Sequence, residues 1–139
     1  MKRTANAHWN GTLMEGIGEL STQSTVLNNT QYSFKTRFAD GIGTNPEELI
    51  AAALAGCFSI ALSATLAHDG FTAGEIFTTA IVDLDIQALS ITGIHLELKA
   101  TLIDGVDVAK FKEIAEGAKT HCIISKALSV PITLNITYA

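Results

Sequence analysis

The two cysteines, Cys57 and Cys122, have the most reactive side chains of this sequence. A cysteine thiolate is a nucleophile, a metal ligand or a redox centre, whereas a free thiol often serves as a small buried hydrophobe. Cys57 lies in an apolar run, residues 49–67, that contains no charged side chain. Because apolar surroundings raise the pKa of a thiol, a reactive Cys57 needs a cation brought to it from elsewhere. From spacing alone, a reactive role and a core role stay equally open for each cysteine.

The sequence pattern gives little support to a metal site or a hydrolase. Zinc ligands usually come in closely spaced pairs, and the chain has no C-x-x-C or H-x-x-x-H motif, so we expect no metal and no cofactor. His68 would follow Cys57 by about 16 Å of helix rise, too far to be its base within one helix. A cysteine hydrolase needs such a base beside its thiol. The other candidate side chains are Arg37, Glu47, Glu48, His8, His95 and His121.

The first half of the chain predicts strands followed by one long helix. Residues 7–38 contain short runs of β-forming residues separated by Gly and Asn turns, which predict a β-meander or hairpin. Asn45 is a good N-cap, Pro46 suits the first helical position, and Glu48 can close a capping box. A helix is therefore expected from Pro46 to about His68, where a following glycine supplies the C-cap.

The second half predicts strands on both sides of an amphipathic helix. Residues 77–89 and a run beginning at Ile91 alternate between apolar and polar side chains, which indicates two long antiparallel strands. Residues 107–121 have apolar side chains at helical spacing, and a short helix (IISKAL) and a final strand (ITLNITY) follow. No repeat or linker divides the sequence, so residues 1–139 are expected to form a single domain.

The long apolar run also has nearly the length of a membrane span. It is rich in alanine, has no flanking Lys or Arg, and precedes amphipathic strands that need a packing partner, so we expect no membrane partner. A helix that is apolar on every face is expected in a core, between a sheet and another layer such as the same helix of a second subunit. The 47% of apolar residues against 17% of charged ones also favours self-association.

Charge and composition exclude further classes of partner. The net charge is −5, and the nine Lys and Arg residues form no basic stripe, so a nucleic acid partner is not expected. The first residues carry positive charge but no apolar segment of the kind found in secretory signals. We therefore expect a cytoplasmic protein, in which the cysteines stay reduced unless a catalytic cycle oxidises them.

The segment TRFADGIGTNPEELIAAALAGCFSIALS resembles the signature of the OsmC/Ohr family of thiol-dependent organic hydroperoxide reductases. In that family an NPEEL helix start precedes the reactive cysteine by a fixed interval. The resemblance extends to AHWNG, STVLNNTQYSF, AKTHCIISKAL and ITLNITY, and thus covers almost the whole chain. The arginine just upstream of GTNPEEL makes the OsmC branch the closer match. The resemblance implies an α+β fold in which antiparallel sheets wrap around a long buried central helix, in an intertwined homodimer.

The resemblance also implies roles for four residues. Cys57 would be the peroxidatic cysteine, Cys122 the resolving cysteine, and Arg37 with Glu47 the pair that organises the thiolate. Such an enzyme reduces alkyl or lipid hydroperoxides to alcohols in oxidative or osmotic stress defence. Its cysteine passes through a sulfenic acid and a disulfide, and an external thiol or dithiol, such as a lipoyl-type one, restores it. One departure is Ile123, which stands where relatives usually have the proline of a Cys-Pro-Val-Ser motif.

Elementary chemistry is consistent with these roles. An arginine stabilises both a thiolate and the oxygen that leaves as the O–O bond breaks, although Arg37 and Glu47 taken alone would be an ordinary surface pair. Apolar residues near Cys57, including Leu54 and Phe58, would form a pocket. Burial of an organic tail in this pocket would favour binding, whereas hydrogen peroxide has no tail to bury.

The spacing along the central helix has a further consequence. Glu47 and Cys57 would be separated by about 15 Å of helix rise, which one arginine head cannot bridge. Two antiparallel helices across a dyad would place Arg37 and Glu47 of one subunit at the other subunit's reactive cysteine. The alternative function is a non-enzymatic small-ligand-binding or stress-interaction protein of the same fold, with both thiols in the core.

Overall fold

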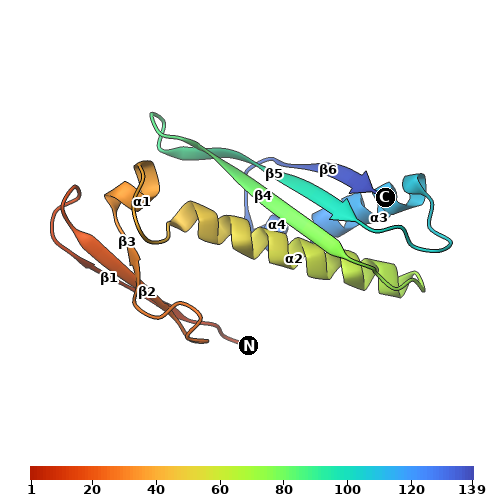
Figure 1. Cartoon of the computed structure of the whole chain (residues 1–139), viewed down its shortest axis with the longest axis horizontal. Coiled ribbons are helices and arrows are strands. Elements are labelled where there is room, and N and C mark those ends of the chain that lie inside the picture. The colour runs from red at the N-terminus through yellow and green to blue at the C-terminus, as the bar shows by residue number, and fades with distance from the viewer. The chain divides into compact units, whose positions relative to one another are not determined.

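The structure is a computed structural model that describes residues 1–139. The chain divides into two compact units, Met1–Leu49 and Ile50–Ala139, and the division falls within the long helix α2 (Pro46–His68). Figure 1 labels the helices and strands in chain order. The α+β class is confirmed, with two small sheets and a long helix. That residues 1–139 behave as a single domain stays a prediction.

The first unit is built on a three-stranded antiparallel meander, as the sequence predicted. Its strands pair in the order β1-β2-β3. Their bounds are β1 (Ala5–Asn10), β2 (Ile17–Thr22) and β3 (Thr30–Tyr32).

The expectation of strand structure up to residue 38 is wrong for α1 (Phe34–Phe38), which is a short helix. Ser33 caps it: the backbone N–H of Thr36 donates to Ser33 Oγ at 3.2 Å, and the backbone N–H of Ser33 donates to Thr36 Oγ1 at 2.8 Å. This reciprocal capping box satisfies two backbone donors locally and overrides the β-propensity of the aromatic and β-branched residues here.

The long helix α2 has the bounds that the sequence predicted. The side chain of Asn45 accepts the backbone N–H of Glu48 at 2.8 Å, so the expected cap is present. The helix ends at His68, and Gly70 follows with φ of +84°, a left-handed conformation that glycine adopts without strain.

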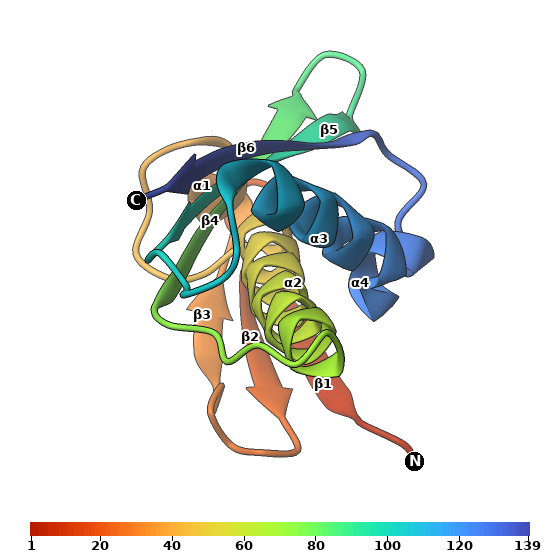
Figure 2. The same ribbon diagram turned by 90° about the vertical axis from the view of Figure 1, so that its right-hand side faces the viewer.

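In the second unit a three-stranded sheet packs on two helices, and the expected strands and helices are confirmed. Strand β5 pairs antiparallel with β4 and parallel with β6, because α3 and α4 form the crossover between β5 and β6. Figure 2 shows α3 beside α2 on the same side of this sheet. The bounds are β4 (Ile76–Asp85), β5 (Ser90–Ala100), α3 (Val108–His121), α4 (Ile123–Ala127) and β6 (Ile132–Tyr138).

Only one stripe of α2 is buried in the single chain. Leu54, Phe58, Leu62 and Leu66 recur every four residues, are fully buried, and pack into the core formed with β5 and α3. The other faces of α2 are also apolar but exposed, and Ile60 is 73% exposed. By length and composition alone α2 is also apolar enough to cross a membrane. The sequence predicted that α2 is buried on every face. In the single chain only one face is buried, and the remaining faces have no packing partner.

Candidate active site

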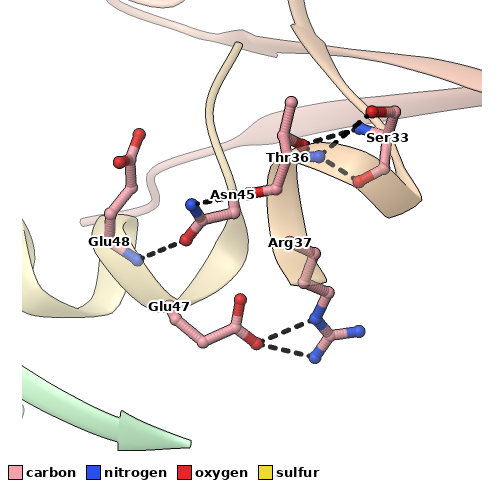
Figure 3. A network of polar contacts seen from close by, with 6 residues as sticks. All are labelled: Ser33, Thr36, Arg37, Asn45, Glu47 and Glu48. Atoms are coloured by element: carbon pink, nitrogen blue, oxygen red, sulfur yellow. Dashed lines mark hydrogen bonds and ion pairs between the residues drawn. The ribbon is translucent and has the colours of Figure 1, made fainter. Parts of the chain in front are cut away.

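Arg37 and Glu47 form a close ion pair within the first unit. Arg37 Nε donates a hydrogen bond to Glu47 Oε1 at 2.9 Å, and Arg37 Nη2 forms an ion pair with the same oxygen at 2.7 Å (Figure 3). The side chain of Glu47 is 12% exposed and that of Arg37 is 45% exposed. The pair leaves Nη1 of the half-exposed guanidinium without a hydrogen bond in the chain. The arginine is therefore held in place while one of its donor groups stays free.

A network around this pair fixes α1 against the start of α2. Asn45 Nδ2 donates to the backbone carbonyl of Thr36 at 3.0 Å, while the oxygen of the same amide caps α2 (Figure 3). Thr44 Oγ1 donates to the carboxylate of Glu48. One side chain, Asn45, thus links both helices, so the positions of Arg37 and Glu47 follow from the caps of the helices that carry them.

The second carboxylate oxygen of Glu47, Oε2, is buried and has no hydrogen-bond partner. Such an unsatisfied acceptor costs about 1–3 kcal/mol, and buried polar groups in native proteins rarely lack a partner. The first unit therefore contains an acceptor for which one chain supplies no donor.

Cys57 and Cys122 meet in the second unit. Cys57 is half-buried on α2, and Cys122 is 1% exposed at the junction of α3 and α4. Both are free thiols that pack in the same core cluster, close enough for the Cys122 side chain to raise the pKa of Cys57. The structure therefore brings together two cysteines whose spacing in the sequence says nothing about proximity.

The surroundings within the second unit disfavour the Cys57 thiolate. Burial raises the pKa of Cys57, and the adjacent Cys122 side chain raises it further. The backbone N–H groups of Ile124 and Ile123 act in the opposite direction. A proline at position 123 would have no N–H, so the departure from the usual motif adds a donor beside this sulfur. A reactive Cys57 still needs a cation that the second unit does not supply.

Leu54 and Phe58 lie in the core on either side of Cys57 along α2, and both are 0% exposed. Their role in a substrate pocket stays a prediction. The sequence did not predict a pocket of about 260 Å³ in the first unit, which the side chain of Arg37 helps to line. Its aromatic walls come from separate segments of the chain. These segments would not lie together if the residues of α1 formed the strand that the sequence predicted.

The histidines hold no metal cluster. No group of three or more His, Cys, Asp or Glu side chains could bind a metal ion. His95 is held by Glu97 at 2.8 Å and by Thr133 at 2.6 Å, and His68 contacts Asp69 at 3.3 Å. These contacts give His95 and His68 structural partners that belong neither to the Arg37–Glu47 ion pair nor to the pair of cysteines.

Known proteins resemble the chain over most of its length. The family model described as OsmC-like protein matches residues 39–137. Peroxiredoxin OsmC of Escherichia coli (strain K12) is 46% identical over 135 residues, covering 96% of this chain and 94% of that protein. The organic hydroperoxide resistance protein of Xanthomonas axonopodis pv. citri (strain 306) is 34% identical over 102 residues, covering 73% and 70%. The crystal structure of the organic hydroperoxide resistance protein OhrB of Bacillus subtilis superposes with a TM-score of 0.70 at 25% identity, covering 96% and 98%.

Proposed function

Because the chain belongs to the family of OsmC-like proteins and is a peroxidase, we propose that it reduces organic hydroperoxides to alcohols through the thiol of Cys57. The observation that carries this proposal is the proximity of Cys57 and Cys122, the only two cysteines of the chain, in one core cluster. A sulfenic acid formed on one of them would have the other as its nearest thiol, and condensation to a disulfide is the usual fate of such a pair.

The proposed reaction has two chemical steps and a reductive step. The Cys57 thiolate attacks the outer oxygen of the hydroperoxide, the O–O bond breaks, and the alkoxide takes a proton to leave as the alcohol. The sulfenic acid then reacts with the thiol of Cys122, so that an S–S bond forms and water leaves. Two electrons from an external thiol pair or dithiol, such as a lipoyl-type one, return both cysteines to thiols.

Arg37 is the proposed source of the cation that this thiolate needs. Its free Nη1 would donate to the peroxide group, and its charge would stabilise both the thiolate and the departing oxygen. Glu47 holds two nitrogens of the guanidinium and thereby fixes its orientation. Leu54 and Phe58 are proposed to form the apolar floor beneath the sulfur, which keeps water away and favours an organic substrate.

We further propose a homodimer with two composite sites. Glu47 and Cys57 lie on the same helix, separated by about 15 Å of rise, so one guanidinium cannot contact both. In the dimer, Arg37 and Glu47 would face Cys57 of the partner subunit. The exposed apolar faces of α2 and the unsatisfied Oε2 of Glu47 support a missing partner. The proposal also places the protein in the cytoplasm, without a membrane or nucleic acid partner.

Mixing two inactive variants should restore activity if the sites are composite. In a heterodimer of Glu47→Ala and Cys57→Ser chains, one site would carry both defects and the other neither. Activity should therefore rise well above that of either parent after subunits exchange, measured as consumption of cumene hydroperoxide. Native mass spectrometry verifies the exchange. No recovery despite verified exchange would show that both residues serve a site within one chain.

The resolving role is tested by Cys122→Ser. This variant should still react with one equivalent of cumene hydroperoxide but accumulate a sulfenic acid, and its turnover with a dithiol should fall at least about tenfold because a thiol of high effective concentration is removed. Trapping with dimedone and steady-state turnover are the measurements. The neighbouring His121→Ala serves as the control and should turn over normally. Unchanged turnover without a trapped sulfenic acid would show that Cys122 does not resolve the oxidised Cys57.

A further inference from the structure

Ser125, in the short helix α4, carries a buried hydroxyl that makes no hydrogen bond. Hydroxyl side chains elsewhere in the helices are satisfied: Ser59, Thr65 and Thr120 each donate to the backbone carbonyl four residues earlier, at 2.9, 2.9 and 3.1 Å. A buried polar group without a partner is costly, and native proteins rarely keep one without a reason. The partner of the Ser125 hydroxyl is therefore expected in a state of the protein other than the reduced one.

The Ser125 side chain lies beside the buried sulfur of Cys122. Cys122 is the N-cap residue of α4 and Ser125 is the third residue of the helix, two positions whose side chains lie on the same side of a helix start. The hydroxyl is close enough to lower the pKa of Cys122, although it makes no hydrogen bond in the reduced protein. Rotation about χ1 alone redirects a serine hydroxyl, so it can turn to the sulfur without movement of the helix.

The surroundings of the two sulfurs act in opposite directions. Burial raises the pKa of Cys57, and the Cys122 side chain raises it further. Burial also acts to raise the pKa of Cys122, but contacts with Cys57 and with the backbone N–H and hydroxyl of Ser125 outweigh it, and the pKa of Cys122 is lowered. Cys57 is half-buried in the chain, whereas Cys122 is 1% exposed. An external thiol therefore reaches the Cys57 sulfur, and Cys122 is the better leaving group.

We propose that the Ser125 hydroxyl turns to the Cys122 sulfur and stabilises the thiolate that leaves when the disulfide is reduced. The inference rests on the proposed function, since it concerns the disulfide that this function forms. A thiolate of the external dithiol attacks Cys57 Sγ, the bond between Cys57 and Cys122 breaks, and its electron pair leaves on Cys122, where the Ser125 hydroxyl donates. The second thiolate of the reductant attacks the external sulfur of the mixed disulfide and releases Cys57. The two protons of the dithiol pass to the two cysteines.

Ser125→Ala separates this role from a structural one. Because the hydroxyl has no partner in the reduced protein, its removal should leave the melting temperature of that state unchanged or raise it. Reduction of the preformed disulfide by dithiothreitol should slow about tenfold, the low end of the effect of losing a hydrogen bond to a charged group. The first turnover of cumene hydroperoxide should keep its rate, because Cys57 reacts before Cys122 takes part.

Two further variants control this experiment. Ser125→Thr keeps the hydroxyl and should recover most of the rate of reduction. Ser129 is an exposed serine just after α4, so Ser129→Ala is the matched control and should be reduced normally. A lower melting temperature of Ser125→Ala together with an unchanged rate of reduction would assign Ser125 a structural role and overturn the proposal.

A titration that needs no turnover gives a second, separable readout. In a Cys57→Ser background Cys122 is the only thiol, and the ultraviolet absorbance of its thiolate is followed against pH. Ser125→Ala should move this titration to higher pH, because a donor that lowers the pKa of Cys122 is lost. A shifted titration in a protein without any peroxidase activity would support the contact of Ser125 and overturn the proposed function. An active peroxidase whose Ser125→Ala variant titrates and is reduced like the unaltered protein would overturn the role of Ser125 and leave the peroxidase in place.

Discussion

Replacing Cys57 by serine is expected to abolish reduction of organic hydroperoxides, with kcat/KM lowered at least about a thousandfold, as for removal of a nucleophile in other enzymes. A hydroxyl cannot be oxidised by a hydroperoxide as a thiolate can, yet it nearly preserves the volume of the side chain. The half-buried position of Cys57 on α2 makes the substitution tolerable for the fold. Consumption of cumene hydroperoxide in the presence of a dithiol is the measurement.

Two controls keep this result interpretable. Far-ultraviolet circular dichroism and thermal unfolding should match those of the unaltered protein, which shows that the substitution removes activity and not folding. Hydroperoxide and dithiol without protein give the background rate. A Cys57→Ser protein that retains full activity would rule out Cys57 as the peroxidatic residue.

Arg37→Ala is expected to lower kcat/KM for cumene hydroperoxide about a hundredfold, the usual cost of removing one electrostatic donor to a transition state. Burial already raises the pKa of Cys57. Loss of the proposed cation would remove the interaction that opposes this rise, so the thiolate fraction at neutral pH should fall. The pH at which alkylation of Cys57 accelerates should therefore move upward, measured with iodoacetamide in a Cys122→Ser background so that one thiol reports.

The same helix offers a matched control for the charge. Lys35 is a second cation of α1 but takes no part in the ion pair with Glu47, so Lys35→Ala should leave the alkylation profile unchanged. Arg37→Lys keeps the charge but cannot donate two hydrogen bonds from a planar fork, and should recover only part of the activity. An alkylation profile that does not move in Arg37→Ala would show that Cys57 is activated by another group.

Elements with strong local signals were predictable from the sequence. Helix α2 begins and ends where its caps predict, because a capping asparagine, a first-turn proline and a terminal glycine act through neighbouring backbone groups. Helix α1 was missed because its residues favour strands, and only the reciprocal hydrogen bonds of Ser33 and Thr36 reverse that preference. The parallel pairing of β5 with β6 depends on contacts distant in sequence, which periodicity does not encode.

The candidate site was predictable to a different extent. The roles of Arg37, Glu47 and both cysteines came from the family resemblance. Spacing alone left a reactive role and a core role open for each cysteine, and it favoured an ordinary surface ion pair for Arg37 and Glu47. The structure adds that Arg37 contacts Glu47 at 2.7 Å and that the two thiols meet. The aromatic pocket could not be predicted, because its walls come from β1, β3, α1 and the loop after β1, and one wall exists only if α1 is a helix.

The central claim, that Cys57 is oxidised by a hydroperoxide and resolved by Cys122, is tested most directly by the mass of the product. One equivalent of cumene hydroperoxide is added to the fully reduced protein, which is then weighed intact and mapped after digestion without reductant. The account predicts the loss of two hydrogen atoms per chain and one disulfide-linked peptide pair that contains Cys57 and Cys122. An unchanged mass with the hydroperoxide unconsumed, or an added oxygen on a residue other than these two, would contradict it.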